Sequence, residues 1–118
     1  MTQLLLDSSA YIAFKNRHPE AIEILQQAEL TFLYPIVLGE LRLFLESSRV
    51  RVLVMDVETS ERYAVIHVAL KMAGTPVGIN DVWIAASAMQ HGLPVLTSDR
   101  DFHKIPQIIV RHFSALPT

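Results

Sequence analysis

The segment Leu4-Leu5-Leu6-Asp7-Ser8-Ser9 is the most informative for the fold, because an aspartate directly follows a short apolar run. We predict a first strand over Gln3–Leu6 that ends at this aspartate. Ser8 and Ser9 are candidate N-caps for a helix running toward Phe14. A strand that leads at once into a helix is typical of an α/β domain.

Short apolar runs alternate with longer amphipathic segments in the rest of the chain, which predicts an α/β domain with a parallel sheet. We expect a helix that begins at Pro19 and helices over Pro35–Phe44, Thr59–Met72 and Asp81–Gln90, the last with Asn80 as its N-cap. We expect further strands at Thr31–Tyr34, Val50–Met55, Pro94–Leu96 and Gln107–Arg111. The third strand of the chain, Val50–Met55, should be buried.

Length and composition limit the possible classes of protein. The chain has 118 residues, which predicts one domain over residues 1–118. Its longest apolar runs are far shorter than the roughly 18 residues that cross a bilayer, and no secretion signal opens the chain. The absence of cysteine fits a reducing compartment, so we expect a cytoplasmic protein. The net charge of −2 and the dispersed basic residues argue against a DNA-binding module, but not against a nuclease that uses a divalent cation.

Several carboxylates lie close to the ends of predicted strands or on the helices next to them. Asp7 follows the first strand, Asp99 follows the fourth, and Asp101 comes two residues later. Glu40 and Asp81 lie on helices that can reach the same edge. Ligands of parallel sheets bind beyond the carboxyl ends of the strands, so we expect Asp7, Glu40, Asp81 and Asp99 to converge there. Clustered carboxylates repel one another unless a hard cation such as Mg²⁺ or Mn²⁺ offsets their charge.

Each of these residues also has an ordinary structural interpretation. Asp7 could start a turn, Glu40 could be a solvated helix residue, Asp81 could complement a helix dipole, and Asp99 could cap the turn before Pro106. The position of all four at strand ends favours a common site. We interpret the five histidines as structural or surface residues, because no pair has the spacing of a zinc motif, and Trp83 and Phe102 as packing residues.

Four segments form a familiar set: Leu4 to Ser9, Gly39-Glu40-Leu41, and the pair Asn80–Ala86 and Leu96–Phe102 with Gly92-Leu93-Pro94-Val95 between its members. Together they resemble PIN domains, and in particular VapC-type toxins of type II toxin–antitoxin systems. The last pair matches in both order and spacing and is the most specific part. Only nine residues separate Glu40 from Val50, where this family usually has an additional helical stretch.

The resemblance implies a three-layer α/β/α sandwich with a central parallel sheet and a Mg²⁺-dependent endoribonuclease. It implies an acidic quartet of Asp7, Glu40, Asp81 and Asp99, in which Asp7, Asp81 and Asp99 hold the metal. Asp101 would be a supporting acid, and Ser9 and Thr97 would orient carboxylates or a water molecule. The implied partners are an RNA substrate, a VapB-like antitoxin and a second copy of the chain.

Two other interpretations stay open at this point. A receiver-type phospho-acceptor domain also gathers aspartates around Mg²⁺, but it needs an acidic pair after the first strand and a lysine after the last. Asp7 is followed by serines, and no lysine follows Ile108–Val110. The other interpretation is a catalytically weak or inactive PIN scaffold that binds RNA or a partner protein.

Overall fold

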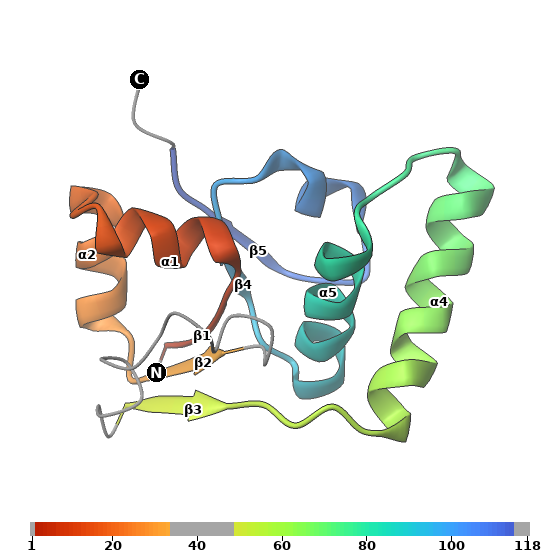
Figure 1. Cartoon of the computed structure of the whole chain (residues 1–118), viewed down its shortest axis with the longest axis horizontal. Coiled ribbons are helices and arrows are strands. Elements are labelled where there is room, and N and C mark those ends of the chain that lie inside the picture. Colours follow the sequence, from red (N-terminus) through yellow and green to blue (C-terminus); the bar gives the residue numbers. More distant parts are fainter. Residues whose placement is uncertain (1, 34–48, 115–118) are drawn as a thin grey trace.

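The computed structural model describes residues 2–33 and 49–114. Within them the strands form one parallel sheet in the order β3-β2-β1-β4-β5 (Figure 1). The chain moves outward from β1 and then returns to the other side of β1, so the strand order reverses between β1 and β4. The strands are β1 (Gln3–Leu6), β2 (Leu30–Leu33), β3 (Val50–Val52), β4 (Val95–Thr97) and β5 (Val110–His112).

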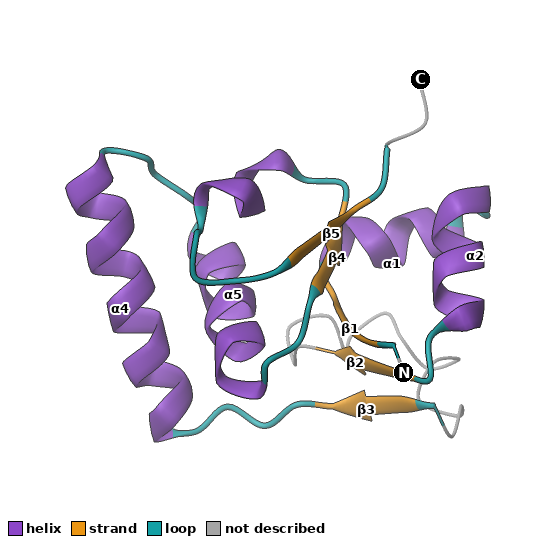
Figure 2. Ribbon diagram, turned by 180° about the vertical axis from the view of Figure 1, so that it is seen from behind, coloured by secondary structure: helices purple, strands orange, loops and turns teal. Residues whose placement is uncertain are grey.

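Helices lie on both sides of the sheet, and on one side the outermost helix packs against another helix and not against the strands (Figures 1 and 2). Helices α1 (Ser8–Lys15) and α2 (Pro19–Gln27) connect β1 to β2, and helices α4 (Val57–Ala73) and α5 (Ile79–His91) lie between β3 and β4. Right-handed crossovers that run in opposite directions along a sheet place their helices on opposite faces. The three-layer α/β/α sandwich with a parallel sheet is therefore confirmed.

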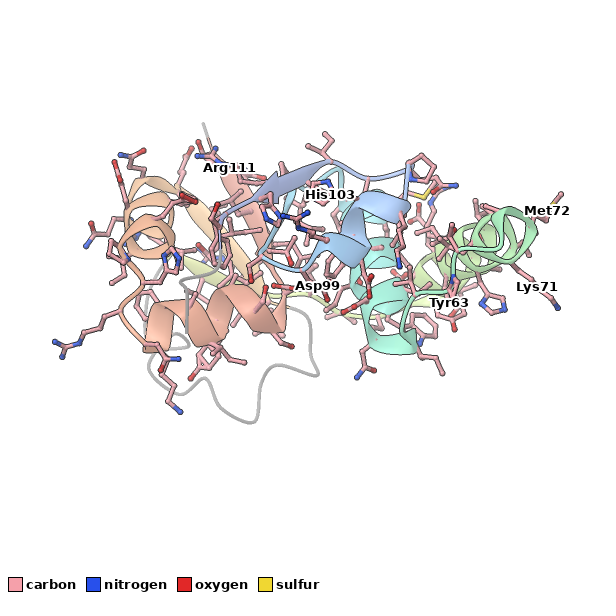
Figure 3. The ribbon with its side chains drawn as sticks, turned by 90° about the horizontal axis from the view of Figure 1, so that it is seen from above. Tyr63, Lys71, Met72, Asp99, His103 and Arg111 are labelled. Atoms are coloured by element: carbon pink, nitrogen blue, oxygen red, sulfur yellow. The ribbon has the colours of Figure 1, made fainter. Side chains whose placement is uncertain are left out.

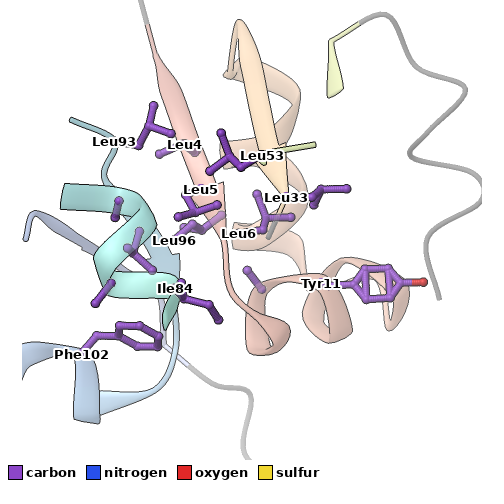
Figure 4. Packing of buried hydrophobic residues seen from close by; sticks show 14 of the residues in the cluster. Leu4, Leu5, Leu6, Tyr11, Leu33, Leu53, Ile84, Leu93, Leu96 and Phe102 are labelled. Carbon is purple, nitrogen blue, oxygen red and sulfur yellow. The ribbon is translucent and has the colours of Figure 1, made fainter. Parts of the chain in front are cut away.

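The core is built around β1, the central strand. Leu4, Leu5 and Leu6 are at most 1% exposed, which is why this strand is an unbroken apolar run rather than an alternating one. Figure 4 shows these leucines between Leu33 and Leu53 on one side and Leu96, Ile84 and Phe102 on the other. Burial on both faces holds the carboxyl end of β1 in place, and Asp7 follows at that end.

The predicted third strand is wrong in its length and its burial. Strand β3 contains only Val50–Val52, and Val54 is 77% exposed. The reason is its place in the sheet, because within the described residues β3 pairs with β2 alone. An edge strand is open on one side, and β-branched composition does not distinguish it from a central strand.

Two predicted helix caps are also wrong. Asp7, rather than Ser8 or Ser9, is the N-cap of α1, because its carboxylate accepts the backbone N–H of Ala10. Helix α5 begins at Ile79 after Gly78, so Asn80 lies inside its first turn.

Other segments agree with the predictions to within a few residues. The helix that begins at Pro19 is confirmed, and Gly92 ends α5 in the left-handed conformation with φ 65°. Strand β5 lies at Val110–His112, later than the predicted Gln107–Arg111. The predicted helix Pro35–Phe44, with Glu40, lies outside the described residues. Within the described part of the chain, no helix has the length and apolar character to cross a membrane.

Candidate active site

Asp7 is buried at the carboxyl end of β1 and both of its carboxylate oxygens accept hydrogen bonds. Asp7 is only 2% exposed. Oδ1 accepts the hydroxyl of Ser9 at 2.7 Å and the backbone N–H of Ala10 at 3.0 Å, while Oδ2 accepts the hydroxyl of Thr97 at 2.7 Å. These bonds hold the carboxylate in one orientation, because a buried carboxylate without partners would be costly.

Thr97 joins this carboxylate to the loop after β4. Its hydroxyl donates to Asp7 and accepts the backbone N–H of Asp99 at 2.9 Å. The hydroxyl of Ser9 lies 3.2 Å from that of Thr97 and accepts the backbone N–H of Ser98 at 2.9 Å. The carboxyl ends of β1 and β4 are thus tied together at the point where the strand order reverses, which is where open α/β sheets bind ligands.

Three further carboxylates form a cluster beside this junction, which we call the acidic trio: Asp81, Asp99 and Asp101. One carboxylate oxygen from each lies within 4.8 Å of the others, and all three residues are half-buried. Asp81 is in the first turn of α5, whereas Asp99 caps η2 (Arg100–Lys104), a 3-10 helix after β4. Asp99 Oδ1 accepts the backbone N–H of Asp101 at 2.8 Å, and Lys104 Nζ pairs with Asp101 at 2.9 Å.

The proximity of these carboxylates makes their ionisation costly. The pKa of Asp81 is raised to about 6, first by burial and then by the charges of Asp99, Asp7 and Asp101. The pKa of Asp7 is also raised, because burial outweighs the hydrogen bonds from Ser9, Thr97 and Ala10, and the charge of Asp99 adds to it. Each raised pKa marks a carboxylate that a nearby cation would stabilise.

The acidic trio fits a hard divalent cation. Its donors are all carboxylate oxygens, the ligand type that Mg²⁺ and Mn²⁺ prefer, and three of them are close enough to share one ion. One positive charge in the immediate neighbourhood, on Lys104, already contacts Asp101. This single ammonium does not balance three carboxylates, so the trio keeps an excess of negative charge.

The structure brings together most of the residues predicted to form the site. Asp81 and Asp99 are in the acidic trio, and Asp7 lies behind them with its oxygens engaged by Ser9 and Thr97. Glu40 lies outside the described residues. Asp101, predicted only as a supporting acid, replaces Asp7 in the set of oxygens within 4.8 Å. The Asp-x-Asp spacing at Asp99 is the sequence signal for this placement, because Asp99 caps η2 and binds the N–H of Asp101.

Comparison with known proteins agrees with this fold and identifies the family. The sequence profile of the PIN domain matches residues 4–108. The chain therefore belongs to the PIN domain family, as the resemblance of its motifs predicted, and not to the receiver class.

Two curated relatives are ribonucleases of Mycobacterium tuberculosis. The chain is 41% identical to ribonuclease VapC4 over 56 residues, which is 48% of this chain and 43% of that protein. It is 42% identical to ribonuclease VapC5 over 48 residues, which is 41% of this chain and 36% of that protein. The aligned part thus spans less than half of either relative.

Solved structures extend the similarity of the fold over almost the whole chain. A chain of DNA-bound VapBC from Salmonella typhimurium superposes with a TM-score of 0.78 at 28% identity, covering 95% of this chain and 98% of that one. A chain of VapBC-5, a member of the VapBC family of toxin–antitoxin systems from Mycobacterium tuberculosis, superposes with a TM-score of 0.73 at 25% identity, covering 96% and 100%.

We predict that acid stabilises the cation-free protein through the site. The pKa of Asp81 is about 6 in the folded state against 3.8 ordinarily, so the folded state binds this proton more tightly. Stability is therefore gained as the pH falls through 6 and lost as it rises. In EDTA, urea unfolding should show a gain of about 1 kcal/mol between about pH 7.5 and pH 5, discounted for the partial exposure of Asp81.

Asp81→Asn tests the source of this gain. The variant should be more stable than the parent at neutral pH and should lose most of the pH dependence, whereas Glu61→Gln, an exposed carboxylate on α4, should behave like the parent. An undiminished pH dependence in Asp81→Asn would show that Asp81 is not the repelled group.

Proposed function

We propose that this protein is a Mg²⁺-dependent endoribonuclease, a VapC-like toxin that hydrolyses RNA phosphodiesters at its acidic cluster. The observation that carries the proposal is the acidic trio beside the buried Asp7, at the point where the strand order of this PIN domain reverses between β1 and β4. Mn²⁺ would serve in place of Mg²⁺, because both are hard ions that bind carboxylate oxygens. The two curated relatives, both named ribonucleases, support the choice of RNA as substrate.

The residues of the site would have different roles in hydrolysis. Asp81, Asp99 and Asp101 would hold the ion, with Glu40 as a further acid. When bound, such an ion lowers the pKa of a water molecule and offsets the charge that develops on the phosphate. Asp7 would act from behind the trio, where Ser9 and Thr97 fix its orientation. The backbone N–H of Asp99 donates to the hydroxyl of Thr97, and this bond would hold Asp99 in place relative to the end of β1.

A protein partner belongs to the same proposal. The neighbours from Salmonella typhimurium and Mycobacterium tuberculosis are VapBC structures, and the second is a toxin–antitoxin system. We propose a VapB-like antitoxin that covers the acidic cluster, a homodimeric toxin that folds as one domain over residues 1–118, and a cytoplasmic location. A basic side chain from the antitoxin would offset the excess negative charge of the acidic trio.

The competing proposal is a PIN scaffold that binds RNA or a partner without cleaving. The repelled carboxylates argue against it, because Asp81 and Asp7 both have raised pKa values and a binding scaffold gains nothing from this cost. The two proposals differ in one observable, which is metal-dependent cleavage.

Cleavage of total RNA in Mg²⁺ or Mn²⁺ tests the nuclease. We expect cuts at discrete sites that disappear in EDTA and in Asp99→Asn, which keeps the size of the side chain and removes its charge. Glu61→Gln is the matched control, with the same change of charge on an exposed helix residue, and should cleave like the parent. Absence of metal-dependent cuts, or equal cleavage by Asp99→Asn, would favour the scaffold.

The partner is tested by coexpression with the protein encoded next to this chain. We expect the two to purify together and the complex to cleave RNA at least roughly tenfold more slowly than the free chain, because the partner would cover the acidic cluster. A neighbour that neither binds nor inhibits would indicate a stand-alone nuclease.

A further inference from the structure

The short helix η2 separates acidic, basic and apolar side chains onto different faces. A 3-10 helix has three residues per turn, so side chains three residues apart lie above one another. Asp101 and Lys104 share one face and form an ion pair. Phe102, which is fully buried, lies on the face toward the core. Arg100 and His103 share the remaining face, and both are exposed.

His112 of β5, which is half-buried, lies beside this exposed face. Its ring lies against that of His103, with centroids 5.1 Å apart and His103 Nε2 3.3 Å from His112 Nδ1. Arg100, His103 and His112 line one open hollow of ≈ 390 Å³. We call these three residues the basic shelf.

The basic shelf offers hydrogen-bond donors that are not used elsewhere. Within residues 2–33 and 49–114, Arg100 makes no hydrogen bond or ion pair, unlike Lys104 four residues later. In the histidine pair, one ring donates across the 3.3 Å contact and the other accepts. A neutral ring that accepts at one nitrogen carries its hydrogen on the other, so one ring N–H stays available in either tautomer. The shelf thus combines a guanidinium fork with an imidazole N–H.

The basic shelf directly adjoins the acidic site. His112 is the register partner of Thr97 across the β4–β5 pair, and Thr97 binds both Asp7 and the N–H of Asp99. Arg100 lies between Asp99 and Asp101 in the chain but on a different face of η2 from Asp101. Figure 3 shows Asp99 and His103 at η2, with Arg111 apart from both.

We propose that the basic shelf is a phosphate subsite that holds the RNA backbone next to the scissile phosphodiester. The inference rests on the proposed function, because it takes the acidic cluster as the place of cleavage. An RNA strand whose scissile phosphate lies at the trio must pass over η2 or away from it, and the shelf is a hollow face of η2 on which Arg100 has no hydrogen-bond or ion-pair partner among residues 2–33 and 49–114. Arg binds phosphate with two parallel N–H groups, and imidazole N–H adds a third donor.

The positive charge of the basic shelf would also reduce the electrostatic repulsion between the acidic site and RNA. RNA approaches carboxylates that repel it, and the chain as a whole carries a net charge of −2. A cation at the trio offsets that repulsion only at the scissile phosphate. Arg100 lies between Asp99 and Asp101 in the chain but on a different face of η2 from Asp101, so it adds a positive charge beside the trio without pairing with the carboxylates that would hold the ion.

RNA binding without cleavage tests the subsite. The background is Asp81→Asn, because Asp81 lies on α5 and leaves η2 intact. The probe is a fluorescent single-stranded RNA oligonucleotide, followed by anisotropy in Mg²⁺ at several salt concentrations. Arg100→Gln should weaken binding about tenfold, and the slope of log K against log salt should decrease in magnitude by about 0.7, as for one lost phosphate contact. Arg100→Lys should keep the slope, because it keeps the charge.

Arg111→Gln is the matched control, with the same loss of charge from an exposed residue of β5. Neighbouring residues of a strand face opposite sides, so Arg111 is not on the side of His112. It should leave affinity and slope nearly unchanged. Equal effects of Arg100→Gln and Arg111→Gln, or no effect of Arg100→Gln, would overturn the subsite. Binding of a polyglutamate peptide in preference to RNA, lost in Arg100→Gln, would also overturn it and assign the shelf to an acidic protein partner.

Cleavage by the unsubstituted chain keeps the two proposals distinguishable. If that chain cleaves RNA while Arg100→Gln binds RNA normally, the subsite fails and the nuclease stands. If that chain does not cleave while Arg100→Gln still weakens RNA binding relative to Arg111→Gln, the nuclease fails, and only the contact between Arg100 and an RNA phosphate stands.

Discussion

The buried hydrogen bond from Thr97 to Asp7 ties the carboxyl end of β1 to that of β4, and the geometry of the site depends on it. The same threonine hydroxyl accepts the N–H of Asp99, so it also sets where η2 begins. A carboxylate that is 2% exposed is tolerated only because each oxygen has a partner. The apolar leucines of β1 hold one end of this link, and the fully buried Leu96 holds the other. The hydrophobic core therefore positions the acidic residues.

Charge separation follows from that anchored start of η2. Because η2 has three residues per turn, Asp101 faces the other two carboxylates of the trio, Phe102 faces the core and Arg100 faces solvent. One short segment thus supplies a carboxylate of the trio, a packing anchor and an arginine that is unpaired within the described part of the chain. The pKa of Asp81 is raised first by burial and then by the neighbouring carboxylates, and a positive charge at the trio would offset this cost. The opposite character of the two faces fits a polyanionic substrate that also needs a divalent ion.

The placement of Asp7 and Asp99 could be predicted because Asp7 directly follows β1, Asp99 comes two residues after β4, and parallel strands end at a common edge. Asp101 was predicted only as a supporting acid, because the Asp-x-Asp spacing is a weak signal and a single 3-10 turn leaves no hydrophobic periodicity to detect. The cap of α1 was predicted at Ser8 or Ser9, since serine and aspartate are equally good caps and only the hydrogen bond to Ala10 decides between them. The exposure of Val54 depends on the neighbours of an edge strand, which are set by tertiary structure.

Binding of Mn²⁺ to the acidic trio, measured without RNA by the electron paramagnetic resonance signal of the free ion, tests the cation site most directly. The parent chain should bind the ion, and Asp101→Asn should weaken binding by roughly tenfold or more, because one of three carboxylates is lost. Glu61→Gln removes the same charge from an exposed helix residue and should bind like the parent. Equal affinity in all three proteins, or no binding by the parent, would contradict the central claim that these carboxylates form a cation site.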